Sequence, residues 1–181
     1  MTNYYGIGLD AEPDPRVTEL TDEQVLKEGV ALHLKPHLAK CTTVVIPEYT
    51  PVDIRTKLIV AFVHLEAYAL ADIVVQPLIT GGPQDVDDLY VDIYEAYMAK
   101  KMYKNALVFL EKLAADHRYC TTKVLLSYAE CLLQCGDMRG AETAYKRVLE
   151  QLPDHVDARL SLSRILNELG ETGEALDFIT Q

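Results

Sequence analysis

The pattern of hydrophobic and polar positions is most regular along residues 122–155. On either side of Gly136, apolar residues recur at intervals of three and four, the spacing that places side chains on one face of a helix. Pro153 closes the segment, since proline cannot continue a helix. The apolar positions are Leu125, Tyr128, Ala129 and Leu132 before the glycine, and Ala141, Ala144, Tyr145, Val148 and Leu149 after it. The pattern therefore predicts a pair of antiparallel helices.

The same arrangement recurs at a constant period along the chain. A small residue opens each expected second helix, with spacings of 35, 35 and 34 residues between Ala71, Ala106, Ala141 and Ala175. A helix–turn–helix unit of about 34 residues, with large, small, aromatic and proline positions in fixed order, is the tetratricopeptide repeat. Because such repeats bury their apolar faces against their neighbours, the sequence predicts an all-α fold, a right-handed superhelix of stacked helix pairs (an α-α solenoid).

Four repeats are expected, at residues 51–84, 87–118, 122–155 and 156–181. Repeat one has a degenerate pattern, with Ile59 where a small residue is usual. Repeat two carries Tyr94 at the equivalent place, which predicts wider helix spacing there. Thr50 is expected to cap the first helix, with Pro51 at its first position. Repeat four is truncated within its second helix, leaving Leu176 and Ile179 uncovered. We therefore expect the repeats to continue in a longer protein, and the open C-terminal end to support self-association.

The first fifty residues lack this period. Residues 1–20 contain several glycines, prolines and acids and are expected to be loop or disordered. Residues 21–50 are expected to hold an N-terminal helix, from Thr21 to about Leu34, and an extended segment. Residues 42–46 are β-branched, but no partner strand is evident. This segment is therefore expected to pack on helices rather than join a sheet.

Net charge indicates which partners are expected, and cysteine content indicates which cellular compartment. The formal net charge is −11, which argues against direct nucleic acid binding and favours basic or neutral protein partners. The sequence contains no run of 18 apolar residues, so no membrane span is predicted. The four cysteines are irregularly spaced, so no disulfide framework is expected. These features indicate an interaction protein of a reducing compartment, with no membrane contact.

Catalytic and metal-binding patterns give no enzyme assignment. The sequence lacks the G-x-S-x-G, H-E-x-x-H and P-loop patterns, so neither catalysis nor a cofactor is expected. His33, His37 and Cys41 are spaced four residues apart, but Pro36 interrupts their helix, which disfavours a metal site. Cys131 is expected to pack between helices rather than react.

The remaining candidate site is the groove lined by the first helix of each repeat. Acidic rims over an apolar floor suit an extended or helical peptide carrying Lys or Arg. A plain solvated groove, or one filled by residues 40–50 of the same chain, remains an alternative. The predicted partner-binding residues are Asp88, Val91, Glu95 and Met98, then Lys123, Leu126, Glu130 and Leu133, then Arg164 and Asn167. Asp53, Thr56, Val60, Val63, Asp157 and Leu160 are the matching positions in repeats one and four.

Four segments carry a resemblance to one family. They are residues 51–58 (PVDIRTKL), 88–97 (DLYVDIYEAY), 126–132 (LSYAECL) and 155–163 (HVDARLSLS), and they resemble the tetratricopeptide subunit of transcription factor IIIC. The resemblance implies a non-catalytic scaffold in the nucleus that helps to assemble transcription factor IIIB on RNA polymerase III promoters. Its implied partners are transcription factor IIIC and IIIB components.

The groove residues also bear on two other classes of tetratricopeptide protein. Chaperone cofactors that bind C-terminal carboxylates use Lys and Asn in the groove, whereas Glu95 and Glu130 stand at the matching positions and would repel a carboxylate. An adaptor that binds a basic or apolar peptide in another intracellular complex remains the alternative.

Overall fold

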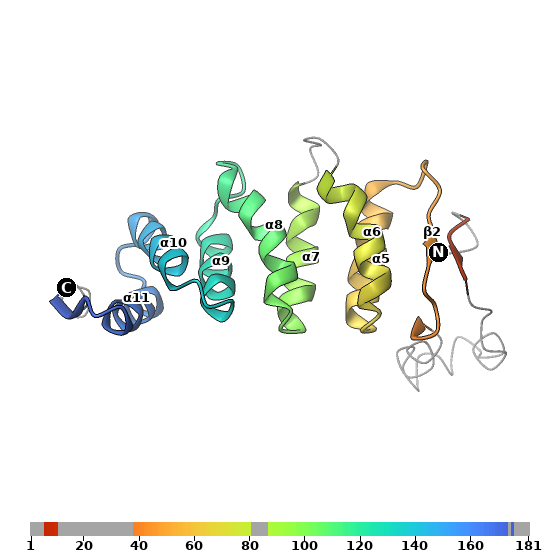
Figure 1. Ribbon diagram of the computed structural model, residues 1–181. Coiled ribbons are helices and arrows are strands. Elements are labelled where there is room, and N and C mark those ends of the chain that lie inside the picture. The colour runs from red at the N-terminus through yellow and green to blue at the C-terminus, as the bar shows by residue number, and fades with distance from the viewer. Residues whose placement is uncertain (1–5, 11–37, 81–86, 174, 176–181) are drawn as a thin grey trace, which may run out of the picture. The chain divides into compact units, whose positions relative to one another are not determined.

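The computed structural model describes residues 6–10, 38–80, 87–173 and 175 (Figure 1). Two compact units divide the chain, unit one ending at Ala96 and unit two beginning at Tyr97, inside one helix. In unit one the elements are β1 (Gly8–Leu9), β2 (Val44–Val45), α5 (Val52–His64), α6 (Tyr68–Thr80) and the start of α7 (Asp87–Ala99). In unit two they are the end of α7, α8 (Tyr103–Ala115), α9 (Thr122–Gln134), α10 (Met138–Gln151) and α11 (Val156–Glu168).

The alanines that set the predicted period occupy equivalent places. Ala71, Ala106 and Ala141 are each the fourth residue of a second helix, and all three are fully buried. Ala175 is buried as well. A methyl group at this position lets the first helix of the repeat approach closely. The all-α repeat architecture is therefore confirmed.

Each turn between paired helices has the same hydrogen bonds. After α9, the N–H of Gly136 donates to the carbonyl of Leu133 at 3.0 Å, and the N–H of Asp137 donates to that of Leu132 at 2.9 Å. This pair of bonds defines a Schellman turn, which needs one residue in the left-handed region. The same pair occurs after α5, α7 and α11, where the left-handed residues are Glu66, Lys101 and Gly170.

The N-terminal region corrects one prediction. β1 and β2 pair antiparallel, with Gly8 opposite Val45 and Leu9 opposite Val44, so the β-branched segment does have a partner strand. The Asp10 carboxylate supports the pairing by accepting the Thr42 N–H at 2.9 Å. Two residues are too few to show a period of their own, and their partner lies far away in sequence. The helix expected from Thr21 lies outside the described residues.

The start of α5 also differs from the prediction. Pro51 is the cap residue rather than the first helical residue, and no side chain caps the helix. The Thr50 hydroxyl is buried and makes no hydrogen bond within the described part of the chain. Arg55 fixes the entry to the helix instead, by donating to the carbonyls of Thr50 at 3.0 Å and Glu48 at 2.8 Å.

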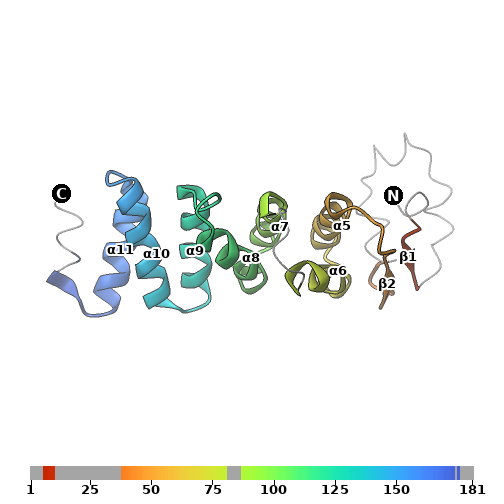
Figure 2. The ribbon, with the colours of Figure 1, turned by 90° about the horizontal axis from the view of Figure 1, so that it is seen from above.

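Helices α9, α10 and α11 follow one another in unit two (Figure 2), and α10 contacts both of the others. Their shared core includes the buried residues Leu125, Ala129, Tyr145, Leu162 and Leu166. The buried core residues of α9 and α10 are apolar positions that recur at intervals of three and four in the sequence. Within unit two, α8 thus packs against α9, α9 against α10 and α10 against α11, as in a repeat protein.

Cys131 on α9 is completely buried, as predicted. Burial raises the pKa of its thiol to about 12, and the nearby Glu130 and Cys135 act in the same direction. The thiol is therefore protonated at neutral pH and unreactive, since the thiolate is the nucleophile.

Candidate partner-binding pocket

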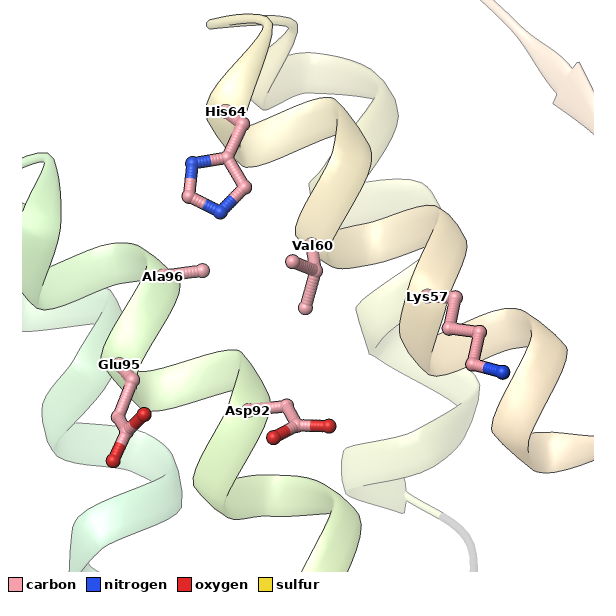
Figure 3. A pocket seen from close by; sticks show the side chains of 6 residues that line it. All are labelled: Lys57, Val60, His64, Asp92, Glu95 and Ala96. Atoms are coloured by element: carbon pink, nitrogen blue, oxygen red, sulfur yellow. The ribbon is translucent and has the colours of Figure 1, made fainter.

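A pocket of about 390 Å³ opens between the first helices of repeats one and two, within unit one (Figure 3). α5 contributes Lys57, Val60 and His64, and α7 contributes Asp92, Glu95 and Ala96. On each helix these residues are spaced by one, three or four positions, so they share one face.

The side chains divide the pocket by chemistry. Val60 and Ala96 face each other across it and form an apolar floor (Figure 3). The His64 imidazole lies at one end, and the Asp92 carboxylate points toward the space below Val60. The ammonium of Lys57 and the carboxylate of Glu95 extend away from the centre. A long side chain with an aliphatic stem and a cationic end matches this arrangement, because its stem would cover the floor and its charge would meet Asp92.

The predicted groove positions of unit one have mixed outcomes. Glu95 and Val60 line the pocket, whereas Asp88 is exposed and Val91 half-buried without lining it. Thr56 and Val63 are buried in the core and are not accessible to a partner, contrary to prediction. Core packing turns α5 so that Lys57 and His64 face the pocket instead.

In unit two, the predicted positions lie on α7, α9 and α11. Lys123, Glu130, Arg164 and Asn167 are exposed, and Met98 is half-buried. Leu126 and Leu133 pack partly against the core of α9, α10 and α11. Leu160 is 56% exposed, an unusual exposure for a large apolar side chain. Partner binding at these positions stays a prediction.

The alternative in which residues 40–50 fill the groove has no support among the described contacts. β2 packs against α6, the second helix of repeat one, and none of residues 40–50 is among those that line the pocket. Val45 and Tyr49 are 67% and 74% exposed, so neither side chain is inserted between helices.

The described residues hold neither a metal-binding group nor a membrane-spanning helix. No group of His, Cys, Asp or Glu among the described residues is arranged to hold a metal ion. Cys41 is buried, and His33 and His37 lie outside the described ranges. Of the helices from α5 to α11, none is long and apolar enough to cross a membrane.

Comparison with known proteins agrees with the repeat architecture. A family model for the tetratricopeptide repeat matches residues 136–181. Solved structures of MamA share the fold at low sequence identity. MamA from AMB-1 gives a TM-score of 0.59 at 18% identity, over 91% of this chain and 88% of that one. MamA from Desulfovibrio magneticus RS-1 gives 0.55 at 15% identity, over 87% and 86%.

Sequence relatives give the family. General transcription factor 3C polypeptide 3 of Homo sapiens is 36% identical over 157 residues, which cover 86% of this chain and 17% of that protein. Transcription factor tau 131 kDa subunit of Saccharomyces cerevisiae is 27% identical over 121 residues, or 67% of this chain and 12% of that protein. The chain thus spans less than a fifth of either relative's length. The chain belongs to the family of general transcription factor 3C polypeptide 3, the tetratricopeptide-repeat subunit of transcription factor IIIC.

Proposed function

We propose that the chain is a non-catalytic protein-binding scaffold in a nuclear transcription factor IIIC, where it helps to assemble transcription factor IIIB on RNA polymerase III promoters. Membership of the family supports the setting. The net charge of −11 supports protein rather than nucleic acid as the direct partner.

One observation carries the proposal of a binding role. The pocket between α5 and α7 combines an apolar floor with the acidic residues Asp92 and Glu95, on helices whose other faces are buried in the core. A rigid scaffold that presents such a surface binds a segment of another protein without having to reorganise. The partner segment is basic and partly apolar, and it places a Lys or Arg stem over Val60 and Ala96.

Charge reversal in the pocket tests the proposal. The double variant Asp92→Lys and Glu95→Lys should bind transcription factor IIIB and IIIC components from nuclear extract about 5- to 30-fold more weakly, because two attractive charges become repulsive. Glu111→Lys with Glu150→Lys is the matched control, since both residues are exposed on second helices and the charge change is identical. The control should bind like the wild type.

The possible results separate the two classes of function. Recovery of these components by the wild type and control, but not by the pocket variant, supports the proposal. Equal recovery by all three proteins would show that the pocket is not the binding surface. Recovery of an unrelated set of proteins by the wild type would favour an adaptor of another complex.

A further inference from the structure

A second pocket, of about 300 Å³, lies in unit two beside the turn that joins α7 to α8. We name it the turn pocket. Its walls come from the turn and the first residues of α8 on one side, and from the end of α9 on the other. The lining residues are Lys101, Met102, Tyr103, Lys104 and Asn105, together with Gln134 and Cys135.

The turn pocket is cationic in an otherwise acidic protein. Lys101 and Lys104 line it and both are exposed, while no Asp or Glu is among its lining residues. The chain as a whole has 28 acidic residues against 17 Lys and Arg. The remaining lining groups include an amide at Asn105, another at Gln134 and the Tyr103 phenol, which can donate hydrogen bonds to an anion.

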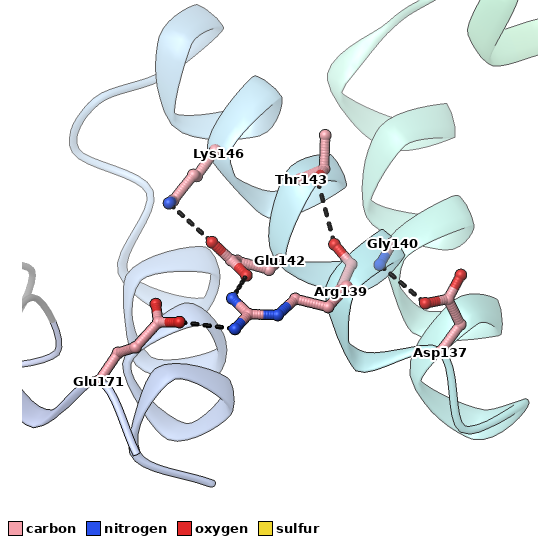
Figure 4. Close-up of polar contacts among 7 residues, drawn as sticks. All are labelled: Asp137, Arg139, Gly140, Glu142, Thr143, Lys146 and Glu171. Atoms are coloured by element: carbon pink, nitrogen blue, oxygen red, sulfur yellow. Dashed lines mark hydrogen bonds and ion pairs between the residues drawn. The ribbon is translucent and has the colours of Figure 1, made fainter. Parts of the chain in front are cut away.

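Repeat three shows how the chain itself treats the equivalent places (Figure 4). Arg139, which corresponds to Lys104, forms ion pairs with Glu142 at 2.9 Å and Glu171 at 2.7 Å. The residue of repeat two that corresponds to Glu142 is Leu107, which has no charge. Helix α8 therefore offers Lys104 no carboxylate at the position of Glu142. The counterpart of Glu171 is Asp137, whose carboxylate caps α10.

The first residues of α10 and α8 also differ, because only α10 is capped by a carboxylate. In repeat three, the Asp137 carboxylate caps α10 by accepting the Gly140 N–H at 2.9 Å (Figure 4). The corresponding residue in repeat two is Met102, whose side chain makes no capping bond to α8. Repeat two therefore lacks two carboxylates that repeat three has, since Met102 replaces Asp137 and Leu107 replaces Glu142.

We propose that the turn pocket binds carboxylates of an acidic segment of a partner protein. Lys101 and Lys104 attract the segment, and its carboxylates pair with their exposed ammonium groups in the pocket. This site is separate from the pocket between α5 and α7 and selects ligands of opposite charge. The inference therefore stands or falls independently of the proposed function.

A fluorescein-labelled hexaglutamate peptide tests the proposal by fluorescence anisotropy at low ionic strength, with hexaglutamine as the neutral control. The full chain should bind hexaglutamate and not hexaglutamine. Lys101→Gln with Lys104→Gln should weaken binding by about 5- to 20-fold, because each exposed charge contact contributes up to about fivefold. Lys101→Gly with Lys104→Gln should behave alike, and glycine suits the left-handed turn.

The matched control removes two positive charges elsewhere. Lys40→Gln with Arg118→Gln alters exposed residues outside the turn pocket, so it should retain wild-type affinity. Amide NMR shifts on adding hexaglutamate should concentrate at Tyr103, Asn105 and Gln134. Equal weakening by both double variants, or no binding to the wild type, would overturn the proposal. Displacement by inorganic phosphate at lower concentration than by acetate would assign the site to phosphoryl groups instead.

Discussion

Lys101 and Gly136 hold the same left-handed backbone position in successive repeats, with φ of 58° and 86°. A side chain with a Cβ is disfavoured in this region by about 1–2 kcal/mol, whereas glycine enters it without a steric cost. Repeats one and two, which carry Glu66 and Lys101 here, therefore form the same turn with backbone strain that repeats three and four avoid.

Substitution at the left-handed position should change stability with opposite sign in different repeats. Gly136→Ala should reduce the free energy of unfolding by about 1 kcal/mol. Apart from its two neighbours in the chain, no described residue has a heavy atom within 4 Å of the added methyl group, so the conformational cost acts alone. Lys101→Gly should instead raise it by about 0.5 kcal/mol, because relief of strain exceeds the added freedom of the unfolded chain. Urea denaturation monitored by circular dichroism measures both changes.

Gly173→Ala is the control for the glycine substitution. Its added methyl group also meets open space, but Gly173 has no left-handed backbone and lies in a helix, where alanine is favoured. This variant should be unchanged or slightly more stable. A similar loss of stability in Gly136→Ala and Gly173→Ala would contradict the backbone explanation.

The cap of α10 couples Asp137 to Gly140. Asp137→Ala should cost about 1 kcal/mol, since the side chain accepts a hydrogen bond from the Gly140 N–H. Gly140→Ala should also destabilise the wild type, because its new methyl group would collide with the Asp137 carboxylate. In the Asp137→Ala background the same substitution should stabilise by up to about 1 kcal/mol, through helix propensity alone. Urea unfolding of the four proteins completes the cycle, and additive effects would show that the two residues are not coupled.

The repeats could be predicted from sequence because packing enforces their period. A small side chain at Ala106 or Ala141 is required wherever two helices cross closely, so the spacing of the alanines reports the register. The β1–β2 pairing escaped prediction, since Gly8 and Leu9 carry no pattern that identifies a distant partner for Val44.

The candidate pocket was only partly predictable. Glu95 was found from the repeat position, but Lys57 and His64 were missed. The rotation of α5 about its axis decides which residues face a neighbouring helix. That rotation depends on burying Thr56 and Val63, and reading the period alone does not fix it. The turn pocket required the structure as well, because Lys101 and Gln134 are distant in sequence.

Stability should fall in acid partly through Glu142 on α10. Hydrogen bonds from Lys146, at 2.7 Å, and from Arg139 lower the pKa of the Glu142 carboxyl. Because the folded-state pKa lies below the unfolded value, the contribution is complete above the unfolded pKa and is lost as pH falls through the folded one. Glu142→Gln should therefore flatten the decline of the melting temperature between about pH 5 and pH 3. Glu150→Gln, an exposed change on the same helix, should leave the slope as in the wild type.

Tyr94 and Ala129 occupy the same position in repeats two and three and are both buried, although their side chains differ greatly in volume. Each core must therefore be fitted to its own residue, so exchanging them should destabilise the chain in both directions. Tyr94→Ala should cost about 3–5 kcal/mol by leaving a cavity. Ala129→Tyr should cost at least about 1–3 kcal/mol by overpacking the space between α9 and α10. Denaturation midpoints with circular dichroism measure both losses, and Ala99→Ser, an exposed change on α7, should be near neutral. If Ala129→Tyr were neutral, the core of repeat three would have room for a ring, and residue size at this position would not determine how closely the paired helices approach.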